Sequence, residues 1–126
     1  MSKTVILIDD DQDDLDLMKE TIRKIDESIF CISFIYPEEA LRVVNRELIF
    51  VPNFIFIDIN MRGLTGDKLL KEFRNNKALD NAVITMFSTS MPSTVSQALK
   101  DSGADFTFQK PSKVTEYPKV IAPILV

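Results

Sequence analysis

The sequence predicts an α/β domain built on an open, doubly wound parallel sheet of five strands, flanked by about five helices. Short apolar runs alternate along the chain with segments whose apolar residues recur at helical spacing, which gives the order βαβαβαβαβα. The runs are mostly apolar on both faces, as strands of a parallel sheet covered by helices must be. The predicted strands are Thr4–Ile8, Ile29–Tyr36, Phe54–Ile57, Ala82–Phe87 and Phe106–Gln109.

The segments between the predicted strands carry apolar residues three or four positions apart, which is typical of helices with one buried face. Pro37 and Pro92 stand where the second and fourth helices begin, and Gly103 stands just after the fourth, where a left-handed residue is favoured. The last segment, Val114–Val126, contains two prolines, and a proline inside a helix costs about 3 kcal/mol. We therefore expect the last helix to be short, kinked or irregular. In the first four predicted helices, the apolar positions at helical spacing are Leu15, Met18, Ile22, Ile25, Leu41, Val44, Leu69, Leu70, Phe73, Val95, Ala98 and Leu99.

Length and composition limit the number of domains and the kinds of partner that the protein can have. We expect residues 1–126 to form one domain, and 45% hydrophobic residues are enough to fill its core. The single Cys31 lies in an apolar run, which excludes a disulfide within the chain and fits a reducing cytoplasm. The formal net charge of −4 comes from 15 basic residues scattered among 19 acidic ones, so direct nucleic-acid binding is not expected. No apolar stretch suits a signal peptide or a membrane span, and we expect a soluble, cytoplasmic protein without a membrane partner.

Polar side chains follow four of the predicted strands. Asp9 and Asp10 follow the first strand, Asp58 the third, Ser88 the fourth and Lys110 the fifth. Because the carboxyl ends of parallel strands meet at one edge of the sheet, these side chains should converge there. Three converging carboxylates need a counter-charge, and oxygen ligands without His or Cys favour Mg²⁺. The sequence therefore predicts a magnesium site at this edge.

The same residues predict a phosphoryl pocket. The Lys110 ammonium is suited to a phosphoryl oxygen, and the Ser88 hydroxyl can donate a hydrogen bond to another. In such a pocket a carboxylate can act as a nucleophile and form an acyl phosphate, while the metal and Lys110 neutralise the transferring group.

Four ordered motifs carry a resemblance to a known family. They are "ILIDDD", "FIFIDINMRGLTG", "VITMFSTS" and "DFTFQKPS", and they span most of the chain. The set resembles the receiver domain of two-component response regulators, the CheY-like domains, whose flavodoxin-like sheet has the strand order 2-1-3-4-5. The resemblance implies that Asp58 is the phosphoacceptor, that Asp9, Asp10 and Asp58 bind Mg²⁺ together with the backbone carbonyl of Asn60, and that Ser88 and Lys110 contact the phosphoryl group.

The resemblance also implies a role in the cell. We expect a stand-alone regulator that takes a phosphoryl group from the phosphohistidine of a histidine kinase or a phosphotransfer protein. Its signal would pass to an unidentified protein effector, through docking at the surface formed by the fourth helix, the fifth strand and the last helix. Its own catalysis would be limited to self-phosphorylation and autodephosphorylation, so we do not expect an enzyme in the usual sense.

The chain departs from the family pattern at several positions. Arg62 replaces a frequent proline and should loosen a turn, and Ser88 replaces a frequent threonine while it keeps the hydroxyl. Thr107 occupies the position of a frequent Tyr or Phe, between Phe106 and Phe108. This departure puts the family's aromatic switch in doubt and leaves open a degenerate receiver that binds its partner regardless of phosphorylation. The two prolines of the last helix also alter a face that family members use for partners.

Simpler explanations compete for the acidic run. Acidic residues near a helix N-terminus are stabilised by about 0.3–1 kcal/mol, which would account for Asp13, Asp14 and Asp16 as a solvated helix start. Asp9, Asp11, Asp13 and Glu20 match part of a calcium loop, although its required glycine is missing. The spacing of Asp9 and Asp11 is similar to that of haloacid-dehalogenase phosphatases, for whose cap 126 residues leave no room. An FMN site is disfavoured because the acidic loop would repel a phosphate.

Overall fold

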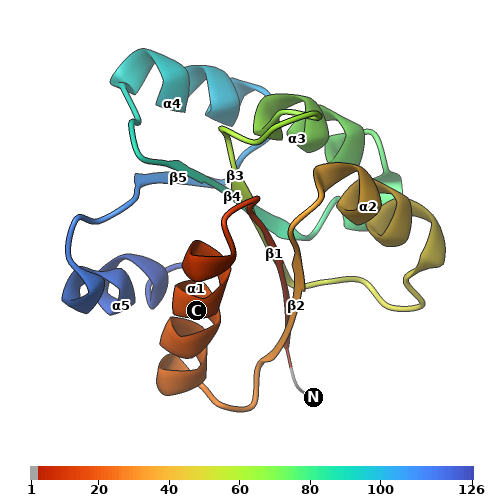
Figure 1. Ribbon diagram of the computed structural model, residues 1–126. Helices are drawn as coiled ribbons and strands as arrows, with labels where there is room; N and C mark the ends of the chain where they lie inside the picture. The colour runs from red at the N-terminus through yellow and green to blue at the C-terminus, as the bar shows by residue number, and fades with distance from the viewer. Residues whose placement is uncertain (1–2) are drawn as a thin grey trace.

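A computed structural model describes residues 3–126 and confirms the predicted fold class. Five parallel strands form one sheet in the order β2-β1-β3-β4-β5 (Figure 1). The strands are β1 (Thr4–Ile8), β2 (Phe30–Phe34), β3 (Phe54–Asp58), β4 (Val83–Ser88) and β5 (Phe106–Gln109). The helices are α1 (Gln12–Ile25), α2 (Pro37–Arg42), α3 (Gly66–Arg74), α4 (Ser93–Asp101) and α5 (Tyr117–Ile121).

Helices cover both faces of the sheet, and each face has its own apolar core. On one face α1 and α5 pack against the sheet, with Leu15, Met18 and Ile121 buried among residues of β1 and β3. On the other face α2, α3 and α4 bury residues such as Leu70 and Leu99. The central strand β3 is buried along its whole length, which explains why its sequence is apolar at every position before Asp58.

The strand register brings the ends of the strands level with one another. Ile8 of β1 is paired with Ile57 of β3, so the residues that follow them, Asp9 and Asp58, lie side by side at the edge of the sheet. Asp58 is paired with Phe87, the residue before Ser88. Ser88 is in turn paired with Gln109, the residue before Lys110. Residues far apart in sequence therefore emerge at one edge of the sheet.

Local sequence signals set several helix ends; those at Pro37 and Gly103 were predicted, and the cap at Asp11 was not. Pro37 is the first residue of α2. Gly103 follows the end of α4 with φ of 116°, and the amide of Ala104 donates to the carbonyl of Leu99. Asp11 caps α1, because its side chain accepts hydrogen bonds from the amides of Asp13 and Asp14.

β3 and β4 each extend one residue beyond the predicted end, to Asp58 and Ser88, and β4 begins at Val83 rather than at Ala82. Two other segments differ more clearly from the sequence prediction, and the last helix agrees with it. β2 is shorter than the predicted Ile29–Tyr36, because the amide of Ile29 is used in the turn after α1 and Tyr36 becomes the N-cap of α2. α2 continues as a π-helical segment, Val43–Glu47, which the periodicity did not predict. The last helix is short as expected, with a 3₁₀ turn (Val114–Glu116) leading into five α-helical residues.

Candidate functional site

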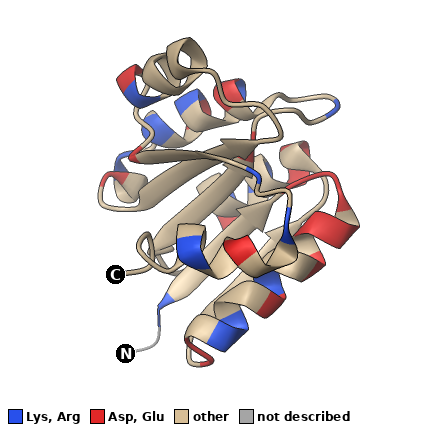
Figure 2. Ribbon diagram, turned by 90° about the vertical axis from the view of Figure 1, so that its left-hand side faces the viewer, with Lys and Arg blue, Asp and Glu red and all other residues tan. Residues whose placement is uncertain are grey.

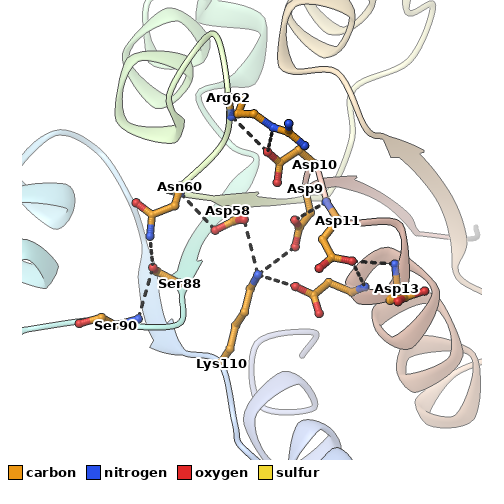
Figure 3. A network of polar contacts seen from close by, with 11 residues as sticks. Asp9, Asp10, Asp11, Asp13, Asp58, Asn60, Arg62, Ser88, Ser90 and Lys110 are labelled. Carbon is orange, nitrogen blue, oxygen red and sulfur yellow. Dashed lines mark hydrogen bonds and ion pairs between the residues drawn. The ribbon is translucent and has the colours of Figure 1, made fainter.

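Three carboxylates meet at the carboxyl edge of the sheet. Asp9, Asp10 and Asp58 each offer an oxygen atom within 4.8 Å of the others (Figure 3). Figure 2 shows further acidic residues along the loop into α1 and on its first turn. The convergence expected from the strand ends is thus present, and the carboxylate oxygens form a compact set of hard donors.

The Asp9 side chain is almost completely buried, with 1% of its surface exposed. Its Oδ1 accepts a hydrogen bond of 3.0 Å from the amide of Asp11, which fixes the carboxylate above the end of β1. Burial, assisted by the nearby Asp58 charge, raises the pKa of Asp9 to about 7, although the Asp11 amide and Lys110 oppose the rise. A bound cation would therefore stabilise the ionised form of this buried carboxyl group.

Asp58 ends β3 and is also buried. Its Oδ1 accepts from the amide of Asn60 at 3.2 Å, while its Oδ2 lies 3.5 Å from Nζ of Lys110. Burial raises the pKa of Asp58, and the Lys110 charge partly offsets the rise. One carboxylate oxygen is therefore held by the backbone and the other faces the lysine.

Gly66 lets the first turn of α3 lie directly against the Asp58 backbone. A Cβ atom at position 66 would lie 2.3 Å from the carbonyl oxygen of Asp58 and 2.7 Å from Cα of Ile59. The amide of Gly66 donates to the carbonyl of Ile59 at 3.0 Å. A side chain at position 66 would therefore push the loop after Asp58 out of place.

Lys110 brings a positive charge into the pocket from the end of β5. Its backbone amide donates to the carbonyl of Ser88 at 2.7 Å, and its Nζ lies 5.2 Å from the centre of the Phe87 ring. Only 10% of its side chain is exposed, and Nζ donates to Asp9 at 3.2 Å as well as to Asp58. Burial alone would lower the pKa of Lys110, but the carboxylates around it outweigh that effect and raise its pKa.

Asp14 is the nearest partner of Lys110, and the solvated-helix explanation is wrong for this residue. Its Oδ2 accepts from Nζ of Lys110 at 2.6 Å, and its side chain is only 27% exposed. Asp13 and Asp16 are exposed, as that explanation expects. The signal was present in the sequence, because Asp14 lies four residues before Met18 on the face of α1 that packs on the sheet.

Arg62 contacts Asp10 through its backbone. The Arg62 amide donates to Oδ2 of Asp10 at 3.1 Å, and the guanidinium Nε lies 3.9 Å from the same oxygen. The Arg62 side chain is 96% exposed, so the amide is the more fixed of the two contacts. A proline at position 62 has no amide hydrogen and could not make this bond. The substitution therefore adds a donor to Asp10.

Ser88 is buried at the end of β4, but its hydroxyl is engaged with Asn60. The Ser88 Oγ accepts from the Asn60 side-chain amide at 2.8 Å and from the Ser90 backbone amide at 3.4 Å. Among residues 3–126, no hydrogen bond joins the Ser88 hydroxyl to Asp58 or to Lys110. The sequence singled out only the backbone carbonyl of Asn60, so the contact of its side chain with Ser88 is new. The carbonyl as a metal ligand stays a prediction.

The donor set fits a hard divalent cation. Three carboxylates, two of them buried, form a site whose oxygen ligands are those that Mg²⁺ takes. The calcium-loop alternative is wrong, because Gln12–Ile25 is helical and the Glu20 carboxylate pairs with Arg23 on the exposed side of α1. The predicted magnesium site and the phosphoryl pocket thus share the Asp58 carboxylate.

Thr107 lies on β5 and is bound to α4. Its Oγ1 lies 2.5 Å from Oγ of Ser96, in a partly buried contact between two hydroxyl groups. A threonine at this position therefore links strand and helix directly, where family members with an aromatic residue would have a ring.

Comparison with known proteins identifies the fold and the family. The sequence model of the response regulator receiver domain matches residues 5–122. The two-component response regulator ORR4 of Oryza sativa subsp. indica is 34% identical over 74 residues, which are 58% of this chain and 32% of that protein. The match thus spans about a third of the length of that relative.

Solved structures show the same architecture. The phosphorylated cyanobacterial phytochrome response regulator RcpA superposes with a TM-score of 0.88 at 18% identity, covering 98% of this chain and 91% of that one. The Mn²⁺-bound form of response regulator Rcp1 superposes with a TM-score of 0.84 at 19% identity, covering 97% and 91%. At these identities the likeness shows the fold alone.

The part of the chain that the structure describes has no helix with the length and apolar character needed to cross a bilayer.

The family match also decides against the phosphatase alternative, because it covers nearly the whole chain with a different domain. The chain belongs to the response regulator receiver domain family.

Proposed function

We propose that Asp58 accepts a phosphoryl group from the phosphohistidine of a histidine kinase or a phosphotransfer protein, and that the reaction depends on Mg²⁺. The observation that carries the proposal is the convergence of Asp9, Asp10 and Asp58 around one point, with Lys110 beside them. Membership of the receiver family implies a role in two-component signalling. The proposal treats residues 1–126 as one receiver domain.

Each residue has a role that follows from its position. An Asp58 carboxylate oxygen attacks the phosphorus atom, the bond from phosphorus to the donor imidazole nitrogen breaks, and an acyl phosphate forms. Asp9, Asp10, Asp58 and the carbonyl of Asn60 would hold Mg²⁺, which when bound neutralises charge on the phosphoryl oxygens. Lys110 offers ammonium protons to the same oxygens, and Ser88 offers its hydroxyl once it turns from Asn60. The Mn²⁺ named for Rcp1 supports a divalent ion here.

Phosphorylation would change the contacts of the β4–α4 loop. The new group adds about 1.5–2 negative charges and strong hydrogen-bond acceptors at Asp58. Ser88 and Lys110 would be drawn toward it. Ser88 ends β4, which leads to α4, and Lys110 directly follows β5, which leads to α5. We propose that the output is docking of an unidentified protein effector at the surface of α4, β5 and α5. A cytoplasmic location and action without an attached effector domain stay predictions.

A second candidate is a receiver that binds its partner regardless of phosphorylation. The specific observation that favours it is the hydrogen bond between Ser96 and Thr107, which joins α4 to β5 without the aromatic side chain of the family pattern. The intact acidic pocket argues against it, because a module that never takes a phosphoryl group has no need for buried carboxylates.

The test is phosphorylation by a small donor. We would incubate the protein with acetyl phosphate and Mg²⁺, follow the intact mass, and repeat the experiment with EDTA and with Asp58→Asn. The proposal expects one added phosphoryl group that both changes abolish, and its slow loss would be autodephosphorylation. An unmodified wild-type protein would contradict the proposal and favour the constitutive binding module. Phosphoryl gain that survives EDTA would contradict the dependence on Mg²⁺.

A further inference from the structure

We propose that Asp14 is a positioning residue for Lys110, which it holds on the α1 side of the pocket in competition with the phosphoryl group on Asp58. This inference rests on the proposed function, because it concerns how readily Asp58 becomes and stays phosphorylated. It assigns a role to an acidic residue that the charge pattern alone would leave as part of a solvated helix start.

The distances rank the partners of Lys110. Its Nζ lies 2.6 Å from Asp14, 3.2 Å from Asp9 and 3.5 Å from Asp58. Figure 3 shows the lysine reaching from the end of β5 toward Asp9 and Asp58. The short contact has the length of a strong charge-assisted hydrogen bond, and the contact with Asp58 is at the limit of one. The ammonium is therefore bound most closely to a residue that lies outside the triad of carboxylates.

Asp14 cannot simply follow the lysine. It belongs to the first turn of α1, whose start is fixed by the Asp11 cap and whose inner face is anchored by buried Met18 and Ile22. The strand end and the Phe87 ring on which Lys110 rests fix the other side of the contact. A closer approach of Nζ to Asp58 must therefore come from motion of the lysine side chain.

A phosphoryl group on Asp58 would demand such an approach. Its oxygens carry more charge than the carboxylate and offer several acceptors, so at least one should come within ordinary hydrogen-bond distance of Nζ. An ammonium has three donors, and a firm bond to Asp14 directs one of them away from Asp58. Asp14 thus lowers the share of Lys110 that is available to the phosphoryl group. It acts as a restraint that keeps the phosphorylated state less stable than the pocket would otherwise allow.

The test uses beryllofluoride with Mg²⁺ as a phosphoryl mimic and measures its affinity by fluorine NMR. Asp14→Asn keeps the size of the side chain and removes its charge, so beryllofluoride should bind roughly five-fold more tightly. The matched control is Asp13→Asn, one residue away, which makes the same change in charge at an exposed position. In a Lys110→Met background Asp14→Asn should have no effect, and a residue with a merely structural role would not show this dependence on Lys110.

The outcomes separate the two proposals. If wild type binds beryllofluoride and takes a phosphoryl group from acetyl phosphate, yet Asp14→Asn equals Asp13→Asn or binds more weakly, the role of Asp14 is refuted and the proposed function stands. An equal gain from Asp14→Asn with and without Lys110 would also refute it, because the effect would not pass through the lysine. If wild type does neither, the proposed function itself fails. Should Asp14→Asn not fold, Asp14→Ser removes the same charge and carries the same expectations.

Discussion

Replacing Lys110 with methionine tests how far this one cation holds the acidic pocket together. The substitution keeps an unbranched side chain that can still pack on the Phe87 ring, and it removes the ammonium alone. The positive charge at 2.6, 3.2 and 3.5 Å from Asp14, Asp9 and Asp58 is lost. The carboxylates then face one another without that counter-charge, and metal-free protein should be less stable.

The size of the loss follows from burial and from proton uptake. Removing one partner of a buried ion pair costs about 3–5 kcal/mol, and the partial exposure of Asp14 puts the expected value at the lower end, about 3 kcal/mol. The pKa of Asp9 is about 7, so at lower pH this carboxyl takes up a proton and removes part of the unbalanced charge. We therefore expect the loss near pH 6 to be at least about 1 kcal/mol smaller than the loss near pH 8.

Urea unfolding followed by circular dichroism at both pH values, without metal and with excess Mg²⁺, measures these quantities. Lys113→Met is the matched control, because Lys113 is exposed in the same loop and its loss should change stability by no more than about 0.5 kcal/mol. Mg²⁺ should restore part of the stability of Lys110→Met, since the ion supplies the missing positive charge. A loss no larger than that of the control, or one that does not change with pH, would refute the electrostatic reasoning.

Three further predictions concern the surroundings of the pocket. Burial raises the pKa of Asp9 from its ordinary value of 3.8 to about 7, so its contribution to the stability of metal-free protein is fully present below pH 3.8 and is lost as pH rises through about 7. Urea unfolding should show this decline, and Asp9→Asn should reduce it; an equal decline in the variant would contradict the assignment. Gly66→Ala places a Cβ atom against the Asp58 backbone, so it should cost about 1–3 kcal/mol and slow phosphorylation, and wild-type behaviour in both assays would contradict the close approach. Thr107→Val removes the hydroxyl bonded to Ser96 and should lower the free energy of unfolding by about 1 kcal/mol. In a double-mutant cycle its effect should not add to that of Ser96→Ala, and additivity would show that the bond contributes nothing.

The sheet and the convergence of the site could be predicted from the sequence because both depend on the order of elements. Apolar runs on both faces predict parallel strands, and polar residues just after those runs must then share one edge. The ends of β2 could not be predicted in the same way. Ile29 and Tyr36 are apolar enough for a strand, but the Ile29 amide donates to Asp26 in the turn after α1, and the Tyr36 carbonyl accepts from Ala40 at the start of α2. The π-helical turns after α2 give no signal in the apolar pattern.

The details of the site depend on side-chain direction, which composition does not give. Asp14 could not be told apart from its acidic neighbours by charge, because a helix N-terminus stabilises any carboxylate in its first turn. Only its helical spacing from Met18 indicated that it lies on the packed face of α1. The bond between Asn60 and Ser88 depends on rotamers at two strand ends. The amide contact of Arg62 with Asp10 depends on the path of a loop rather than on the arginine side chain.

We propose that the acidic pocket makes one carboxylate, that of Asp58, reactive toward a phosphoryl group. The most direct measurement is to phosphorylate the protein with acetyl phosphate and Mg²⁺, reduce the acyl phosphate with borohydride, and locate the reduced residue by peptide mass spectrometry. We expect reduction to convert residue 58 alone from aspartate to homoserine. Reduction at Asp9, Asp10 or Asp14 in its place, or no reduced residue in a protein that is fully folded, would contradict it.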